Sequence, residues 1–179
     1  MSLAPPISDL ESLRSWPALS QLLAWRPDAV LSAKYDRGEL SVSLAPSALR
    51  DACLLLRDDP VLQFNFLSDL TCVDWHPSEP RLEVVYHLLS LANVRARAPE
   101  PGQVPSALAR LRLKVRLDSS DPRLDSVTPV WPSANFFERE VFDLFGVHFE
   151  GHPYLRRLLM PENWEGHPLR KDYPVEGYR

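Results

Sequence analysis

The chain has 179 residues, of which 45% are apolar and 25% charged, and its formal net charge is -4. This length favours one domain, and this composition is that of a globular protein. No apolar run reaches the roughly 20 residues of a membrane-spanning helix, and the N-terminus carries neither a secretory signal nor a transit-peptide pattern. We therefore expect no direct membrane span and a cytoplasmic protein.

The first part of the chain predicts a helix, a hairpin and a second helix. Ser8 with Glu11 forms a capping-box pattern before apolar residues at helical spacing, and Pro17 interrupts or restarts this first helix. Two half-alternating runs around a Gly-containing turn at 36–38 then predict a β-hairpin. The second helix is expected from Pro46 to Asp58 because apolar residues recur there every three or four positions.

Three further strands are expected, over 64–74, 82–91 and 108–117. The run 82–91 is apolar on both faces, as a central strand covered on both sides would be. Before the last strand, residues 95–107 contain three prolines and resemble an insertion, so we expect an exposed, extended loop there.

A third helix is expected to close the globular part. Asn135 with Glu138 is a possible capping box, an apolar stripe follows, and Gly146 fits the C-cap. The resulting order α-β-β-α-β-β-β-α does not alternate strictly. We therefore predict an α+β, two-layer domain with a mixed sheet over residues 1–146.

Residues 147–179 have a different character, with four prolines and little regular pattern. Their arginines and aromatic residues are the types found at interface hot spots, and the segment is too apolar to be a disordered tail. We predict an extended, proline-containing C-terminal arm that binds neighbouring subunits. It carries two similar stretches, Gly-His-Pro-Tyr-Leu-Arg from 151 and Gly-His-Pro-Leu-Arg-Lys from 166.

The histidines of this arm do not form a pattern typical of a metal site. His148 and His152 would share a helical face, but Gly151 and Pro153 disfavour a helix there, and no His-Glu-x-x-His motif occurs. The two cysteines form no C-x-x-C pair, which disfavours a zinc or iron-sulfur cradle. We predict no metal ligand in this chain.

Catalytic and nucleotide-binding patterns are similarly weak. Glu138, Glu140 and Asp143 could act as general acids or bases, but charges at this helical spacing are more typical of a solvated or salt-bridged face. No glycine-rich phosphate loop and no nucleophile elbow are present. We therefore predict neither a catalytic residue nor a cofactor bound by this chain.

The strand 108–117 raises the alternative of nucleic-acid binding. It alternates strictly, with apolar residues on one face and Arg110, Arg112, Lys114 and Arg116 on the other. Such a row could follow phosphates, but the net charge is negative and no aromatic residue alternates with the cations. A solvated face or an acidic protein neighbour fits better, and we predict no nucleic-acid partner.

Several segments together closely resemble the C subunit of the proton-pumping NADH:quinone oxidoreductase, respiratory complex I. They are LSDLT at 67–71, VVYH at 84–87, FEREVFDLFG at 137–146, GHP at 151–153, LRR at 155–157, LMP at 159–161 and GHPLRKDYP at 166–174. The resemblance covers residues 45 to 174, and before that only the order of helix and hairpin agrees.

The resemblance implies a structural subunit without a cofactor of its own. It would lie in the hydrophilic part of the complex, peripheral on the cytoplasmic side of a bacterial plasma membrane, against the quinone-site D subunit and the iron-sulfur B and I subunits. The complex itself uses FMN, iron-sulfur clusters, NADH and quinone, and it couples electron transfer to proton translocation. The resemblance implies an assembly role for Glu138, Arg139, Glu140, Asp143, Gly146, Gly151, His152, Pro153, Arg156, Arg157, Gly166, His167, Pro168, Arg170, Lys171, Asp172 and Tyr173.

Two other functions stay open on the sequence. The chain could be the equivalent subunit of a related complex, such as a membrane-bound nickel-iron hydrogenase or the ferredoxin-using photosynthetic relative. It could also be an enzyme that uses the acids of the 137–146 segment.

Overall fold

A five-stranded mixed sheet, with strand order β1-β2-β5-β4-β3, forms the centre of the domain. The computed structural model describes residues 5–96 and 103–177. The strands are β1 (Val30–Asp36), β2 (Glu39–Leu44), β3 (Phe66–Asp74), β4 (Leu82–Leu89) and β5 (Arg110–Leu117). β2 and β5 run parallel, and the other neighbouring pairs are antiparallel. The predicted α+β fold with a mixed sheet is confirmed.

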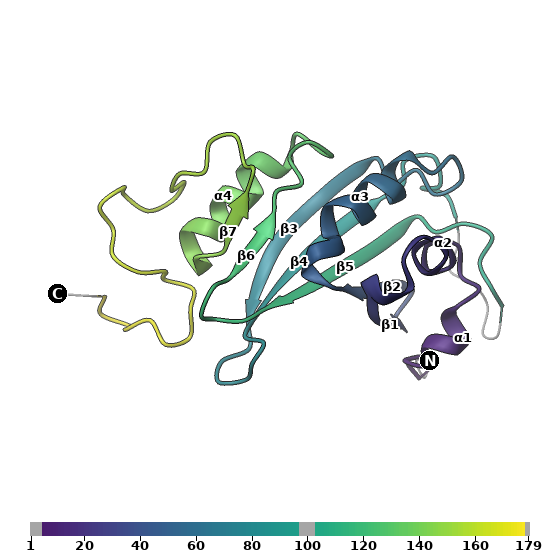
Figure 1. Cartoon of the computed structure of the whole chain (residues 1–179), viewed down its shortest axis with the longest axis horizontal. Helices are drawn as coiled ribbons and strands as arrows, with labels where there is room; N and C mark the ends of the chain where they lie inside the picture. The colour runs from purple at the N-terminus through teal and green to yellow at the C-terminus, as the bar shows by residue number, and fades with distance from the viewer. Residues whose placement is uncertain (1–4, 97–102, 178–179) are drawn as a thin grey trace.

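Helices cover one face of this sheet, and α2 and α3 lie in front of it in Figure 1. The helical elements are α1 (Leu10–Leu13), α2 (Pro17–Trp25), η1 (Pro27–Ala29), η2 (Pro46–Ala48), α3 (Leu49–Asp58) and α4 (Ala134–Phe145). The apolar side chains of β5, such as Leu113 and Val115, are fully buried in the core under the helices. The strict alternation of this strand is therefore confirmed.

The predicted hairpin and the predicted central strand also form. Arg37 and Gly38 both have positive φ, 53° and 85°, which is the backbone of a tight two-residue turn between β1 and β2. β4 lies between β3 and β5, and its residues from Leu82 to Tyr86 are all buried.

Both predicted capping boxes are wrong. Asp9, not Ser8, is the N-cap of α1, and its carboxylate accepts hydrogen bonds from the backbone N–H groups of Glu11 and Ser12. Helix α4 begins two residues earlier than a cap at Asn135 would require, with Ser133 as N-cap. Glu138 therefore lies beyond the first turn of the helix, and its side chain is buried.

Two short strands that the sequence did not predict extend the folded domain beyond Gly146. β6 (Arg123–Asp125) and β7 (His148–Glu150) pair in parallel on either side of α4 in the sequence. Val147 and Phe149 are fully buried or nearly so. The folded domain therefore continues through Glu150 rather than ending at Gly146, and the C-terminal arm proper is residues 151–177.

Two expectations concern segments outside regular structure. Residues 97–102 of the expected loop at 95–107 lie outside the described residues, and the described flanks contain no helix or strand. Among the described residues, no helix has the length and apolar character needed to cross a bilayer.

Candidate functional site: the C-terminal arm on helix α4

The C-terminal arm runs around α4 and returns toward the β3–β4 hairpin, as the yellow trace in Figure 1 shows. It contains no helix or strand of its own. Its shape therefore depends on bonds to the domain, and these bonds converge on α4 and on one carboxylate at the end of β3.

The first set of bonds centres on Asp143, whose side chain is fully buried. One carboxylate oxygen accepts three consecutive backbone N–H groups, from Leu158, Leu159 and Met160, at 3.0, 2.7 and 2.8 Å. The other accepts the guanidinium of Arg157 at 2.6 Å. Burial alone would raise the pKa of Asp143, but these bonds favour the ionised form more strongly and hold the pKa below its ordinary value.

Two arginines fix the arm by donating to backbone carbonyls. Arg157 also donates to the carbonyls of Trp164 and Gly166, at 2.9 and 3.1 Å, so it closes a loop within the arm. Arg139, on α4, donates to the carbonyls of Arg156 and Arg157, both at 3.2 Å. Arg139 and Asp143, four residues apart on α4, therefore both bind the arm.

The first Gly-His-Pro stretch binds near the start of α4. His152 Nε2 lies 3.1 Å from the carbonyl of Asn135, and Nδ1 lies 3.0 Å from the backbone N–H of Tyr154. A carbonyl only accepts and an N–H only donates, so the ring is the neutral tautomer protonated at Nε2. Burial lowers the pKa of His152, which agrees with this neutral form.

The second Gly-His-Pro stretch binds the last turn of α4, where backbone carbonyls have no partner within the helix. His167 Nδ1 donates to the carbonyl of Asp143 at 2.9 Å, the backbone N–H of Leu169 donates to Leu144 at 3.1 Å, and Arg170 donates to Phe145 at 2.6 Å. A cationic group at this end of a helix also favours the helix dipole. The two Gly-His-Pro stretches therefore bind the two ends of the same helix, α4.

Gly146 makes the second contact possible. Its φ of +76° is the left-handed backbone expected of a helix C-cap. A Cβ at this position would lie 2.5 Å from Nε2 of His167 and 2.8 Å from a guanidinium nitrogen of Arg170. Only glycine leaves room for both side chains.

The end of the arm is fastened to the domain through Arg81. This buried guanidinium donates to both carboxylate oxygens of Asp74, each at 2.8 Å, and to Asp172 at 2.6 and 2.9 Å. Asp74 also accepts the backbone N–H of Lys171 at 2.7 Å. Hydrogen bonds from Arg81 hold the pKa of Asp74 and that of Asp172 below their ordinary values.

The predicted residues Arg156 and Tyr173 make bonds within the arm. Arg156 donates to Glu162 at 2.8 Å and to the hydroxyl of Tyr154. Tyr173 donates from its hydroxyl to the carbonyl of Glu165 at 3.4 Å.

The three acids of α4 do not converge on one site. Glu138 is fully buried and accepts Ser126 Oγ at 2.6 Å and the backbone N–H of Val127 at 2.7 Å. Burial raises its pKa to about 7. Glu140 is exposed and has no hydrogen bond or ion pair to the rest of the described chain. Because Asp143 binds the arm, the three carboxylates have separate surroundings.

The histidines are equally dispersed. In the described parts of the chain, 5–96 and 103–177, no three His, Cys, Asp or Glu side chains are placed to share a metal ion. His148 lies on the exposed edge of β7, 3.7 Å from Glu150.

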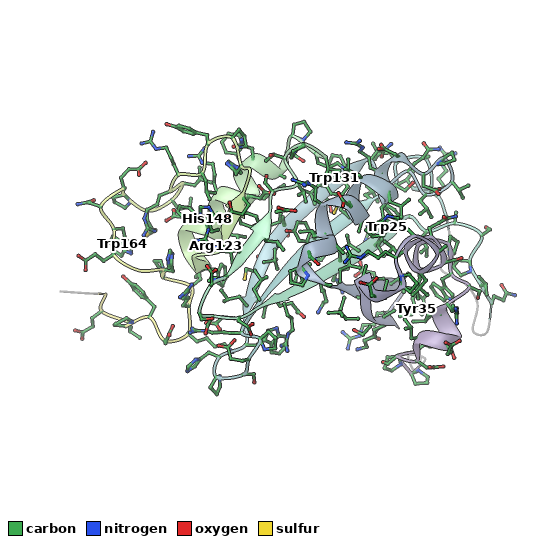
Figure 2. The ribbon with its side chains drawn as sticks, viewed as in Figure 1. Trp25, Tyr35, Arg123, Trp131, His148 and Trp164 are labelled. Atoms are coloured by element: carbon green, nitrogen blue, oxygen red, sulfur yellow. The ribbon has the colours of Figure 1, made fainter. Side chains whose placement is uncertain are left out.

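The arm exposes large apolar and aromatic side chains. Tyr154, Leu159, Trp164 and Leu169 follow each other at intervals of five residues, and each is between 40% and 56% exposed. Figure 2 shows Trp164 at the outer edge of the molecule, on the arm and away from the sheet. We call these four residues the apolar ridge. The sequence pointed to its aromatic members but not to its two leucines, because an irregular segment has no periodicity that would mark them.

Comparison with known proteins identifies the family. A family model described as "Respiratory-chain NADH dehydrogenase, 30 Kd subunit" matches residues 42–179, which contain α4, both Gly-His-Pro stretches and the arm. The chain belongs to this family. The resemblance noted on the sequence is therefore confirmed.

Relatives in the 30 Kd subunit family are named as the C subunit of NADH-quinone oxidoreductase. One from Roseiflexus sp. (strain RS-1) is 49% identical over 157 residues, 88% of this chain and 82% of that protein. One from Rhodobacter capsulatus is 43% identical over 153 residues, 86% of this chain and 69% of that protein. These matches show that the chain is a homologue of a subunit of an oxidoreductase complex.

Two solved structures share the fold of this 30 Kd family member. The trypsin-resistant fragment (1–134) of Nqo5 is 34% identical with a TM-score of 0.56, covering 78% of this chain and all of the fragment. A chain of the membrane-bound sulfane sulfur reductase, an archaeal respiratory membrane complex, is 27% identical with a TM-score of 0.65, covering 88% of this chain and 84% of that chain.

Proposed function

We propose that this chain is a non-catalytic structural subunit of the peripheral hydrophilic part of an NADH:quinone oxidoreductase, and that it docks there through the apolar ridge. The ridge carries the proposal. A segment that is fixed by hydrogen bonds and exposes a tyrosine, a tryptophan and two leucines has the composition of an interface core.

The predicted assembly residues support this role indirectly. Arg139, Asp143, Arg157, His167 and Arg170 form hydrogen bonds within the chain, and these bonds hold the arm in one conformation. A neighbouring subunit would then meet the ridge in a fixed conformation, which reduces the ordering entropy lost on binding.

Membership in the 30 Kd subunit family supports the surroundings that we propose. The partners are the quinone-site D subunit and the iron-sulfur B and I subunits, on the cytoplasmic side of a bacterial plasma membrane. FMN, the iron-sulfur clusters, NADH and quinone are bound by other subunits. This chain contributes position and stability to the assembly and no group to the transfer of electrons.

A second candidate is the equivalent subunit of a related respiratory membrane complex. It is favoured by the likeness to a chain of the sulfane sulfur reductase, which extends over 88% of this chain. The two candidates differ in the electron donor and acceptor of the assembly, while the role of this chain within it is the same.

Purification through an affinity tag on this chain, from membranes of the producing organism, tests both candidates. We expect iron-sulfur subunits and NADH-dependent quinone reduction to copurify. Subunits of another respiratory complex without that activity would select the second candidate, and recovery of a free monomer alone would refute both.

The ridge itself is tested by Leu159→Ser combined with Trp164→Ser. We expect the chain to fold normally, as judged by its thermal unfolding midpoint, and its yield in the purified complex to fall at least tenfold. The matched control is Leu31→Ser with Val61→Ser, because both residues are about as exposed as Leu159 but lie on β1 and after α3. Equal yields for the two double variants would exclude the ridge as the docking surface.

A further inference from the structure

The sheet has a second, uncovered face that the arm does not use. On β5 the apolar side chains point into the core, and the alternate residues Arg110, Arg112, Lys114 and Arg116 point to the opposite side. Because β5 lies between β2 and β4, this row of cations runs along the middle of the sheet. We call it the β5 stripe.

Two carboxylates form ion pairs with the four cations of the β5 stripe. Arg112 donates to Glu39 on β2, and Lys114 donates to Glu83 on β4 at 2.9 Å. The cations at the two ends are held loosely, with Arg110 3.7 Å from Glu39 and Arg116 3.7 Å from Glu83. Neither end residue donates a hydrogen bond to any described residue, so both ends keep unused guanidinium donors.

Near each end of the β5 stripe, the same face of the sheet carries an exposed aromatic side chain. The guanidinium of Arg116 sits 5.2 Å from the ring centre of Trp75, which is 42% exposed. At the other end Phe66, 46% exposed, pairs across the sheet with Leu89, which in turn pairs with Arg110. Arginine next to exposed aromatic residues is the combination enriched at protein interfaces.

A cavity of about 360 Å³ opens beside Arg110. Its polar lining is formed by Glu39, Ser68, Asp69, His87, Arg110 and Arg112. Asp69 and His87 face each other across β3 and β4, and neither side chain has a hydrogen-bond partner within the described residues. The cavity thus has room for an incoming side chain, a donor in Arg110 and acceptors in Asp69 and His87.

We propose that the uncovered face of the sheet is a second docking surface, which binds an acidic surface of a neighbouring protein subunit. Carboxylates of the partner would lie over Arg110 and Arg116, and apolar side chains would pack on Phe66 and Trp75. Four cations against Glu39, Glu83 and Asp69 leave this face locally positive, although the whole chain has a net charge of -4. This inference rests on the proposed membership in an assembly and names a different surface from the ridge.

Nucleic acid is a less suitable occupant. Phosphates following the stripe would approach the carboxylates of Glu39 and Glu83, and the ring of Trp75 is already covered on one side by Arg116.

Photo-crosslinking in the assembled complex tests this surface. Benzoylphenylalanine is placed at position 66 or 75 of the full chain, the complex is purified after irradiation, and the crosslinked peptide is sequenced. We expect both positions to reach the same neighbouring subunit, at a peptide rich in Asp and Glu, while position 31 on β1 does not. Crosslinks that reach only nucleic acid, only a second copy of this chain or no macromolecule would overturn the proposal.

Charge reversal provides the second measurement. Arg110→Glu with Arg116→Glu should lower the yield of this chain in the complex at least tenfold, with the loss shrinking as the salt concentration of the wash rises, because salt screens the new repulsion from the acidic partner. The control is Arg37→Glu with Arg95→Glu, which changes the net charge by the same amount. These two exposed arginines lie outside β5, between β1 and β2 and after β4. Equal yields for both double variants would reject the second surface while leaving the proposed function intact. Absence of the unmodified chain from any complex would instead refute the proposed function.

Discussion

The domain and the C-terminal arm of this protein are held by different forces. The domain is held by one continuous core of buried apolar side chains between the sheet and the helices. The arm buries little and is fixed at separate points, by Asp143, by the last carbonyls of α4 and by the pair of Arg81 with Asp74. Burial is cooperative and non-directional, whereas each polar anchor acts over one or two bonds. The arm can therefore detach locally while the domain stays folded.

The largest expected effect comes from the core. Leu113→Ala removes a fully buried side chain from the centre of β5 and should lower the free energy of unfolding by about 3 kcal/mol. Urea unfolding followed by circular dichroism measures it.

Trypsin digestion under native conditions is the companion measurement. The arm contains cleavable sites at Arg156, Arg157, Arg170 and Lys171. If domain and arm are held independently, Leu113→Ala leaves the rate of arm cleavage unchanged. A parallel rise in arm cleavage would show that the two regions unfold together.

The next effect is a pH dependence at the junction of the two regions. Burial raises the pKa of Glu138 from 4.5 to about 7, so the folded state retains a proton that the unfolded state releases. The stabilising contribution is complete below pH 4.5 and is lost as the pH rises toward 7. Its full size is roughly 3 kcal/mol by linkage.

Glu138→Gln isolates this contribution, because the buried histidines of the arm have lowered pKa values and act with the opposite sign. His152 and His167 destabilise the fold as the pH falls below about 6.5. The difference in unfolding free energy between the natural chain and Glu138→Gln should therefore shift in favour of the variant as the pH rises from about 5 to about 8. A difference that does not change with pH would mean that Glu138 ionises normally.

The contrast between the two regions also explains what the sequence could predict. The alternation of β5 and the glycine stop of α4 are local patterns that follow directly from strand and helix geometry. The three-residue strands β6 and β7 are too short to show any period. The partners of Asp143 and Arg139 could not be predicted, because they lie 14 to 18 residues further along and are mostly backbone groups of an irregular segment.

The predictions for the arm residues therefore have an uneven outcome. Their chemistry, cations and histidines in an extended segment, pointed to charge-assisted hydrogen bonds, and such bonds form. Their assembly role stays a prediction, since the described contacts lie within the chain. Composition does not distinguish a bond to one's own helix from a bond to a neighbour.

The smallest effect should come from the exposed anchor of the arm. Asp172 is about half exposed, while its partner Arg81 is buried and keeps Asp74 as a second carboxylate. Asp172→Asn therefore leaves no unpaired buried charge. The ion pair with Arg81 that it removes is already weakened by solvent at the exposed Asp172 side chain. We expect less than about 1 kcal/mol of destabilisation, with a salt-dependent rise in trypsin cleavage at Lys171. Asp74→Asn removes the buried partner and should cost about 3 kcal/mol, affecting domain and arm together. If the two substitutions are equally costly, the end of the arm is part of the core and not a separately fastened segment.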